Sequence, residues 1–336
     1  MNDFLNSLIE TEIRPFLHEL APAGSMMLHA FLYCAVILAS GLLVCQGQEI
    51  LRARIEMRPV RSVIRRLRRG CVMLLKQPAV PEHAQKTLFV AAPLFAFVFS
   101  LFFFFFLPVN QEYFLHPDFS LLYLLFVASC GTYAFITGGW SSATRFSFFG
   151  AVRMIAQSLC CQSILTVVVM TILMTAGAPD LYSVIRAQRK IWFVAPHFPL
   201  FVLYLLSVAM LLGQAPFEAP KSKRELAGGV CAEYGGGLYL LFLACENILL
   251  LLCAALGSVL FLGGTMPLFG SAGLPSFAWL AIKTCLLLFI LTLMKYVLPS
   301  WRTDRLMNMS FKVFLPFALV WLVGTAGILY FMQKGA

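Results

Sequence analysis

GLYLLFLACENILLLLCAALGSVLFL, residues 237–262, decides the fold, because only one of its side chains, that of Glu246, is charged. A helix needs about 20 consecutive apolar residues to cross the hydrocarbon core of a bilayer. Inside that core no water is present to bond the backbone, so the segment must satisfy its own amide groups as a helix. The stretch therefore predicts a transmembrane helix that contains a single acid.

Seven further apolar runs surround this one, and together they set the fold class. The chain of 336 residues is 60% hydrophobic and 12% charged, with a mean hydropathy of +0.86, which excludes a soluble domain with an ordinary polar surface. The runs are also too long and too apolar for the alternating strands of a membrane β-barrel. We predict an all-α polytopic membrane protein, a single membrane domain over residues 1–336 with about eight transmembrane helices. The other seven runs are 25–46, 87–108, 120–138, 151–176, 192–213, 277–298 and 311–332.

The net charge of +10 indicates the orientation of these helices. The inner-side loops would be 47–86, 139–150, 214–236 and 299–310 if the loop after the first run faces the cytoplasm or matrix. The Lys and Arg residues left on the opposite side are then Arg14, Arg186, Arg189, Lys190 and Lys334. This asymmetry is typical of membrane proteins, whose inner loops are the more basic. Because the basic residues adjoin membrane spans, the charge does not favour nucleic-acid binding.

Two segments favour helices at the membrane surface. Residues 1–22 contain Glu10, Glu12 and Glu19 and lack a cleavable signal pattern, while apolar residues recur at helical spacing. We expect an N-terminal amphipathic helix there, with a frayed polar lead as the alternative. The arginine-rich loop 48–77 interleaves basic and apolar residues, which favours docking to the membrane or a partner over contact with lipid headgroups alone.

The sequence contains no recognisable site for a metal or a nucleotide. Its ten cysteines show no CxxC spacing and no clustering with histidines. It also lacks a GxGxxG fingerprint and a phosphate-binding P-loop. We therefore expect no metal ligands and no cofactor bound by this chain alone, so that any redox cofactor lies on a partner subunit.

Among the ionisable residues within the apolar runs, three stand out, namely Arg153, Glu246 and Lys283. A charge at such a depth costs about 2.5–3.5 kcal/mol on insertion scales and is a candidate functional group. Glu246 and Lys283 could approach near the middle of the bilayer and relay protons, or form a static buried pair. Arg153 either extends to the membrane surface or has a functional role.

A polar island, QAPFEAPKSKRELAGGVCAEY at residues 214–234, separates two apolar runs. Its charged residues are Glu218, Glu225 and Glu233 and the cations Lys221, Lys223 and Arg224. In a chain with so few charges, this cluster of charged residues indicates a functional segment rather than a simple connecting loop.

Motifs in this island resemble the H-subunit family of NADH:quinone oxidoreductase, respiratory complex I. The family shows APFD, an acid-rich stretch, EL and EYS, and this chain has APFE at 215–218, REL at 224–226 and AEY at 232–234, with Glu246 after them. Longer similar stretches are ARIEMR at 53–58, LLKQPAVPEHAQKTLFVAAP at 74–93, GWSSATRFSFFGAVRMIAQSL at 139–159, IKT at 282–284 and LPSWRTDRLMNMSFKVFLP at 298–316. The resemblance covers nearly the whole chain.

The resemblance implies a membrane protein that joins the peripheral redox arm to the proton-translocating membrane arm. Quinone would be the substrate, and FMN and iron–sulfur clusters would lie on partner subunits that dock on loops 47–86 and 214–236. Other membrane-arm subunits and lipid would be further partners, in a bacterial cytoplasmic or a mitochondrial inner membrane. The implied quinone-chamber residues are Arg54, Phe217, Glu218, Glu225, Glu233 and Tyr234. The implied proton-path residues are Glu246, Lys283 and Arg153.

Several positions depart from the family pattern. Lys221 and Lys223 stand where the family usually has acids, and Leu211 and Gln162 replace family carboxylates. Further departures are Arg69 for Asp, Gln77 for Glu and Gln214 for Arg. An amide cannot release a proton at neutral pH, so these changes favour weakened proton coupling.

Three alternative functions follow. The chain could be a membrane anchor for the redox arm with weakened coupling, or the related membrane subunit of a group 4 [NiFe] hydrogenase. A free-standing transporter is the third, and the absence of an internal repeat in the sequence disfavours it.

Overall fold

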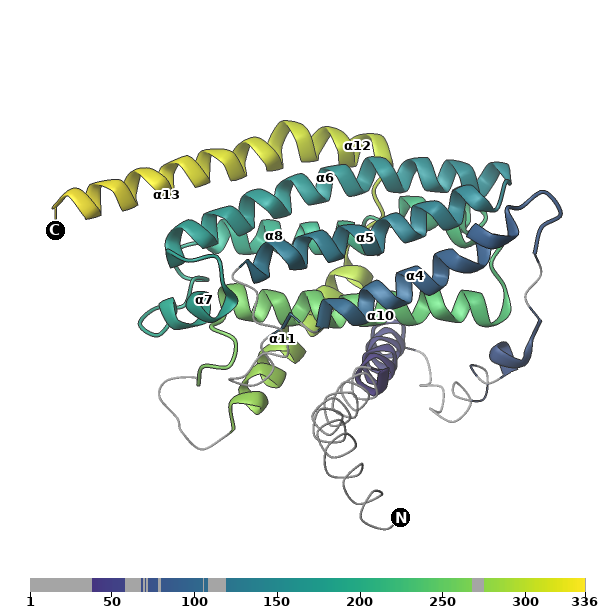
Figure 1. Ribbon diagram of the computed structural model, residues 1–336, viewed down its shortest axis with the longest axis horizontal. Coiled ribbons are helices and arrows are strands. Elements are labelled where there is room, and N and C mark those ends of the chain that lie inside the picture. The colour runs from purple at the N-terminus through teal and green to yellow at the C-terminus, as the bar shows by residue number, and fades with distance from the viewer. Residues whose placement is uncertain are drawn as a thin grey trace, which may run out of the picture.

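The computed structural model describes residues 38–57, 68, 70, 72–77, 80–104, 106–107, 119–267 and 275–335. The regular elements in these residues are all helices (Figure 1). This confirms the all-α polytopic fold. The expected N-terminal amphipathic helix, Arg69 and residues 25–37 of the first apolar run lie outside the described residues.

Six helical stretches are long and apolar enough to cross a membrane, and they confirm six of the eight predicted spans. Five of them are α4 (Lys86–Phe104), α5 (Ser120–Ser141), α6 (Arg145–Ala176), α10 (Gly236–Phe261) and α11 (Ser276–Val297). The sixth combines α12 (Thr303–Met309), the π-helical turn η5 (Ser310–Phe314) and α13 (Leu315–Gly335). Helices α4, α5, α6, α10 and α13 lie alongside one another as a bundle, and α11 is inclined to them (Figure 1). A further helix over residues 38–55 contains the end of the first predicted run.

The fifth predicted span, 192–213, is shorter in the structure. Its helix α8 (Phe198–Leu211) has 14 residues and is about 21 Å long, less than the hydrocarbon thickness of about 30 Å. Residue 192 is irregular, turns occupy residues 193–197, and Pro199 lies in the first helical turn, where its missing N–H costs nothing. At the other end Gly213 adopts a positive φ of 57°, which stops the helix. The short helix α7 (Leu181–Ala187) precedes these turns.

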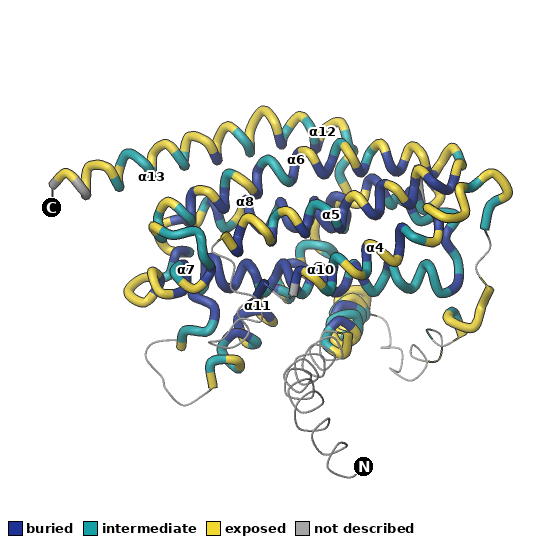
Figure 2. The backbone as a smooth tube through the Cα atoms, viewed as in Figure 1, coloured by how far each residue is buried: buried dark blue, intermediate teal, exposed yellow. Residues whose placement is uncertain are grey.

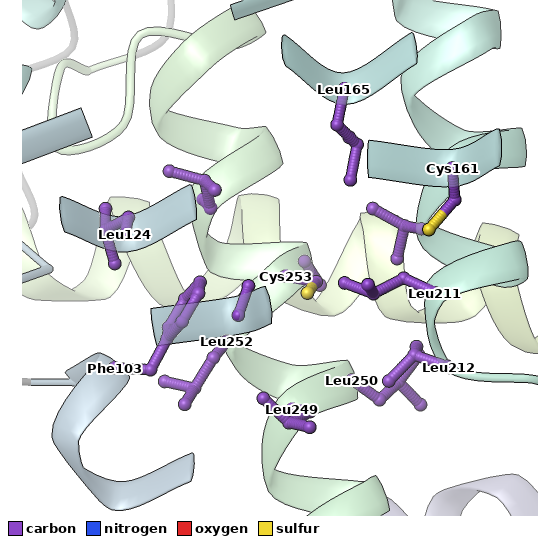
Figure 3. Packing of buried hydrophobic residues seen from close by; sticks show 14 of the residues in the cluster. Phe103, Leu124, Cys161, Leu165, Leu211, Leu212, Leu249, Leu250, Leu252 and Cys253 are labelled. Atoms are coloured by element: carbon purple, nitrogen blue, oxygen red, sulfur yellow. The ribbon is translucent and has the colours of Figure 1, made fainter. Parts of the chain in front are cut away.

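The bundle is held together by interlocking apolar side chains. Figure 3 shows Cys161 of α6, Leu211 of α8 and Leu250 of α10 meeting in this core. Figure 2 shows exposed residues on the outward faces of the bundle. Large apolar side chains such as Phe126 are exposed, and in a membrane they would contact lipid rather than water. Along the top of the bundle α13 follows α6, and its C-terminal part projects beyond the other helices (Figure 1).

The close approach of α6 to residues 229–230 of the polar island requires a glycine at position 150. A Cβ built on Gly150 would lie 2.5 Å from the amide nitrogen of Val230 and 2.8 Å from the carbonyl carbon of Gly229. Both neighbours are backbone atoms, so they cannot move aside as a flexible side chain would. Gly229 itself has a positive φ of 56° and lies under the carbonyl of Pro220. Segment 229–230 is therefore seated directly on the start of α6.

Substitution Gly150→Ala should destabilise the protein by about 1–3 kcal/mol, the usual cost of overpacking a tight contact. Thermal unfolding in mild detergent would show this as a lower midpoint. Gly237→Ala is the matched control, since no atom lies within 4 Å of a Cβ built at Gly237. Equal midpoints for the two variants would contradict the close approach.

Candidate functional site

The polar island folds into the end of the bundle instead of extending away from it. It forms three short turns of helix, η2 (Ala219–Lys221), α9 (Lys223–Leu226) and η3 (Gly229–Cys231). Ser222 begins α9, since its hydroxyl oxygen accepts a hydrogen bond of 3.1 Å from the amide of Glu225. Ala219, Pro220 and Val230 are buried, so the middle and the end of the island both contact the spans.

Neutral hydrogen bonds hold the start of the island. The side-chain amide of Gln157, on α6, donates to the carbonyl oxygens of Met210 at 2.7 Å and Phe217 at 2.9 Å. The backbone amide of Trp301 donates to the carbonyl of Pro216 at 2.8 Å. Phe217 is buried against the Trp301 ring, with 5.9 Å between ring centroids. The carbonyls of this irregular segment are thus satisfied from α6 and from the loop before α12 (Thr303–Met309).

Tyr234 holds the other end of the island. Its ring stacks on that of Phe89 with 4.1 Å between centroids, and its hydroxyl lies 3.1 Å from the carbonyl oxygen of Phe89 and 3.2 Å from that of Gly138. Burial raises the pKa of the Tyr234 phenol to about 12. The hydroxyl therefore stays protonated at neutral pH and can donate to either carbonyl.

The middle of the island is held by a charge. The ammonium group of Lys221 lies 2.7 Å from Oε1 of Glu246 on α10 and 3.0 Å from the carbonyl oxygen of Leu212. It also lies 4.6 Å from the centroid of the Phe135 ring on α5. Both charged side chains are largely buried, with exposed fractions of 14% for Lys221 and 21% for Glu246.

The surroundings of this ion pair are mostly apolar. A small cavity beside it, with a volume of about 10 Å³, has room for about one water molecule. Its lining residues are Thr132, Phe135, Met154, Leu211, Leu212, Lys221, Glu246 and Leu249. Burial lowers the pKa of Lys221, but the Glu246 carboxylate and neighbouring groups together raise it by more, so the net shift is upward and the amine stays charged. Burial raises the pKa of the nearby Cys231 thiol to about 12, so it stays neutral.

The remaining island acids face outward. Glu225 pairs with Arg153 at 2.5 Å across a partly exposed surface, where the two side chains are 49% and 32% exposed. Glu218 is exposed and Glu233 is partly exposed. Arg54 is exposed near the end of the helix over residues 38–55 and belongs to another element.

The expected approach of Glu246 and Lys283 is wrong. The ammonium group of Lys283 donates to the carbonyl oxygens of Leu262, Gly264 and Met266 at 2.7, 3.1 and 2.7 Å. Leu262 lies about 24 Å beyond Glu246 along the axis of α10, at a rise of 1.5 Å per residue. Lys283 thus binds carbonyls at the C-terminal cap of α10 and in the turns that follow it, far from Glu246.

A second polar contact near Glu246 was not expected from the sequence. Lys295 of α11 donates to the side-chain oxygen of Gln48 at 3.3 Å, and Gln48 donates in turn to Asn247 of α10 at 3.5 Å. The three residues lie on three different helices, and none belongs to a recognisable motif. Their sequence signal is weak, because only the fold brings them together.

Two of the departures from the family pattern lie in the interior. Leu211 is buried and lines the cavity beside the ion pair. Gln162 lies on α6, and its side-chain nitrogen is buried without a hydrogen-bond partner in the structure. Among the described residues, no group of three or more His, Cys, Asp or Glu side chains could hold a metal ion.

Comparison with known proteins agrees with this architecture. The NADH dehydrogenase family model matches residues 13–326. The H subunit of the NADH-quinone oxidoreductase of Paramagnetospirillum magneticum is 35% identical over 263 residues, 77% of each chain. The corresponding H subunits of Rhodospirillum centenum and Pelagibacter ubique are 35% and 33% identical, covering 76% and 77% of this chain and 78% and 80% of their own lengths. The chain is therefore an integral membrane protein that belongs to the NADH dehydrogenase family.

Proposed function

We propose that this chain is the membrane subunit of an NADH:quinone oxidoreductase that forms part of the quinone-binding chamber and links electron transfer to proton translocation. The observation that carries this proposal is the polar island, which has the family's motifs and is held in the end of an apolar bundle by bonds to α4, α5, α6 and α10. The relatives named above are bacterial, which favours a bacterial cytoplasmic membrane.

In this proposal the island divides its work between two faces. The outward acids Glu218, Glu225 and Glu233 would meet the peripheral-arm subunits, and Arg54 would contribute to the same chamber wall. The buried rings of Phe217 and Tyr234 would fix the backbone of the island, because both pack against spans. FMN and iron–sulfur clusters on partner subunits would supply electrons to the quinone. This chain would form part of the wall of the chamber in which quinone is reduced and would exclude water from it.

Proton coupling would involve the charges that remain near the bundle interior. Glu246 is the best placed of these, since it is the largely buried acid that Lys221 of the island contacts. Arg153 would act at the surface, where its pair with Glu225 joins α6 to the island. Lys283 would contribute indirectly, since its three carbonyl partners favour a structural tie.

Removal of this chain should abolish NADH:quinone reduction in membranes. Reduction of a water-soluble acceptor that takes electrons directly from the peripheral arm should persist, because that reaction does not need the quinone chamber. Both rates are measured on membranes from a deletion strain, and expression of the wild-type chain is the control that restores the first. Quinone reduction that continues in the deletion strain would refute the proposed function.

Substitution of Glu246→Gln or Glu233→Gln should abolish proton translocation per NADH oxidised, since an amide cannot take up and release a proton at neutral pH. The ratio is measured in vesicles at saturating quinone. Glu82→Gln is the matched control, because Glu82 is an exposed acid outside the bundle. An unchanged ratio in both variants would instead favour the membrane-anchor alternative.

A further inference from the structure

We infer that Lys221 is a positioning residue, whose ion pair with Glu246 holds the polar island in the bundle and thereby sets the shape of the quinone chamber. This inference rests on the proposed function, which it extends to a residue that departs from the family's acidic pattern. The lysine that reversed the expected charge of the loop is thus the one that ties the loop to the membrane helices.

The ammonium group of Lys221 contacts several elements of the bundle at once. An ammonium group has three N–H donors, and two of them find acceptors in Glu246 and the carbonyl of Leu212. The face of the Phe135 ring adds a cation–π contact. These partners lie on α10, at the end of α8 and on α5, so one side chain joins three elements of the bundle to η2.

Weak screening makes this tie stronger than its surface counterpart. The cavity beside Lys221 and Glu246 has room for only about one water molecule, so little solvent would screen the two charges. The pair between Arg153 and Glu225 is partly exposed, and such pairs contribute little to stability. Of these two pairs, the buried one is therefore the one able to fix the island.

Two ion pairs hold the middle of the island, the buried Lys221–Glu246 pair and the partly exposed Arg153–Glu225 pair. Gln157 and Trp301 bond the backbone at Pro216 and Phe217, and Tyr234 bonds the opposite end. Between them, η2 carries the buried Ala219 and Pro220 into the bundle, directly before Lys221. Loss of the buried ion pair would leave the two ends attached and loosen η2, which would move the chamber wall without detaching the loop.

Kinetics of quinone reduction test this role. Lys221→Met and Glu246→Gln should each raise KM for a short-chain ubiquinone at least about tenfold while kcat changes less than about threefold, since each leaves a buried charge unpaired. The charge-swapped double variant Lys221→Glu/Glu246→Lys should recover most of the loss in KM. Lys190→Met is the matched control, because Lys190 is exposed at the other end of the bundle. A wild-type KM in both single variants, or no recovery in the double variant, would overturn the inference.

A measurement on the wild-type complex covers the case in which a variant does not assemble. An amine-reactive reagent should label Lys190 readily and Lys221 at least about tenfold more slowly, as expected for an amine held in a buried ion pair. Mass spectrometry of the labelled complex gives both rates. Equal rates would overturn the inference, whereas quinone reduction in a strain without the chain would refute the proposed function itself.

Discussion

A buried attraction between a lysine of a polar loop and an acid of a membrane helix is the interaction on which this structure depends. The island between α8 and α10 has too many polar groups to remain among apolar helices unless each is bonded. Lys221 and Glu246 satisfy the most costly of these groups by pairing with each other. Gln157 then satisfies the Phe217 carbonyl at the start of the island, and the Tyr234 hydroxyl at its end bonds carbonyls of α4 and α5.

This arrangement explains how an apolar bundle can present a polar surface at one end. Spans α4, α5, α6 and α10 supply a rigid frame, and glycines such as Gly150 let the loop backbone lie directly on it. Under the proposed function, the quinone chamber would take its shape from this frame, and the redox groups would lie on partner subunits.

The sequence predicted the fold well because each long apolar run has few structures open to it in lipid. It overestimated the fifth span, where Pro199 and Gly213 shorten the helix. It singled out Glu246 as an acid within a membrane helix but expected it to approach Lys283, because depth in the membrane was counted along separate helices. Pairing of Glu246 with Lys221 depends on the polar island folding back into the bundle, and no local sequence pattern predicts that fold.

A density map of the intact complex with bound quinone tests the central claim most directly. The account predicts the Lys221 ammonium within about 4 Å of the Glu246 carboxylate, with quinone density beside the island and flavin and iron–sulfur subunits docked over it. A map in which Lys221 points to solvent and the island lies away from α10 would contradict it.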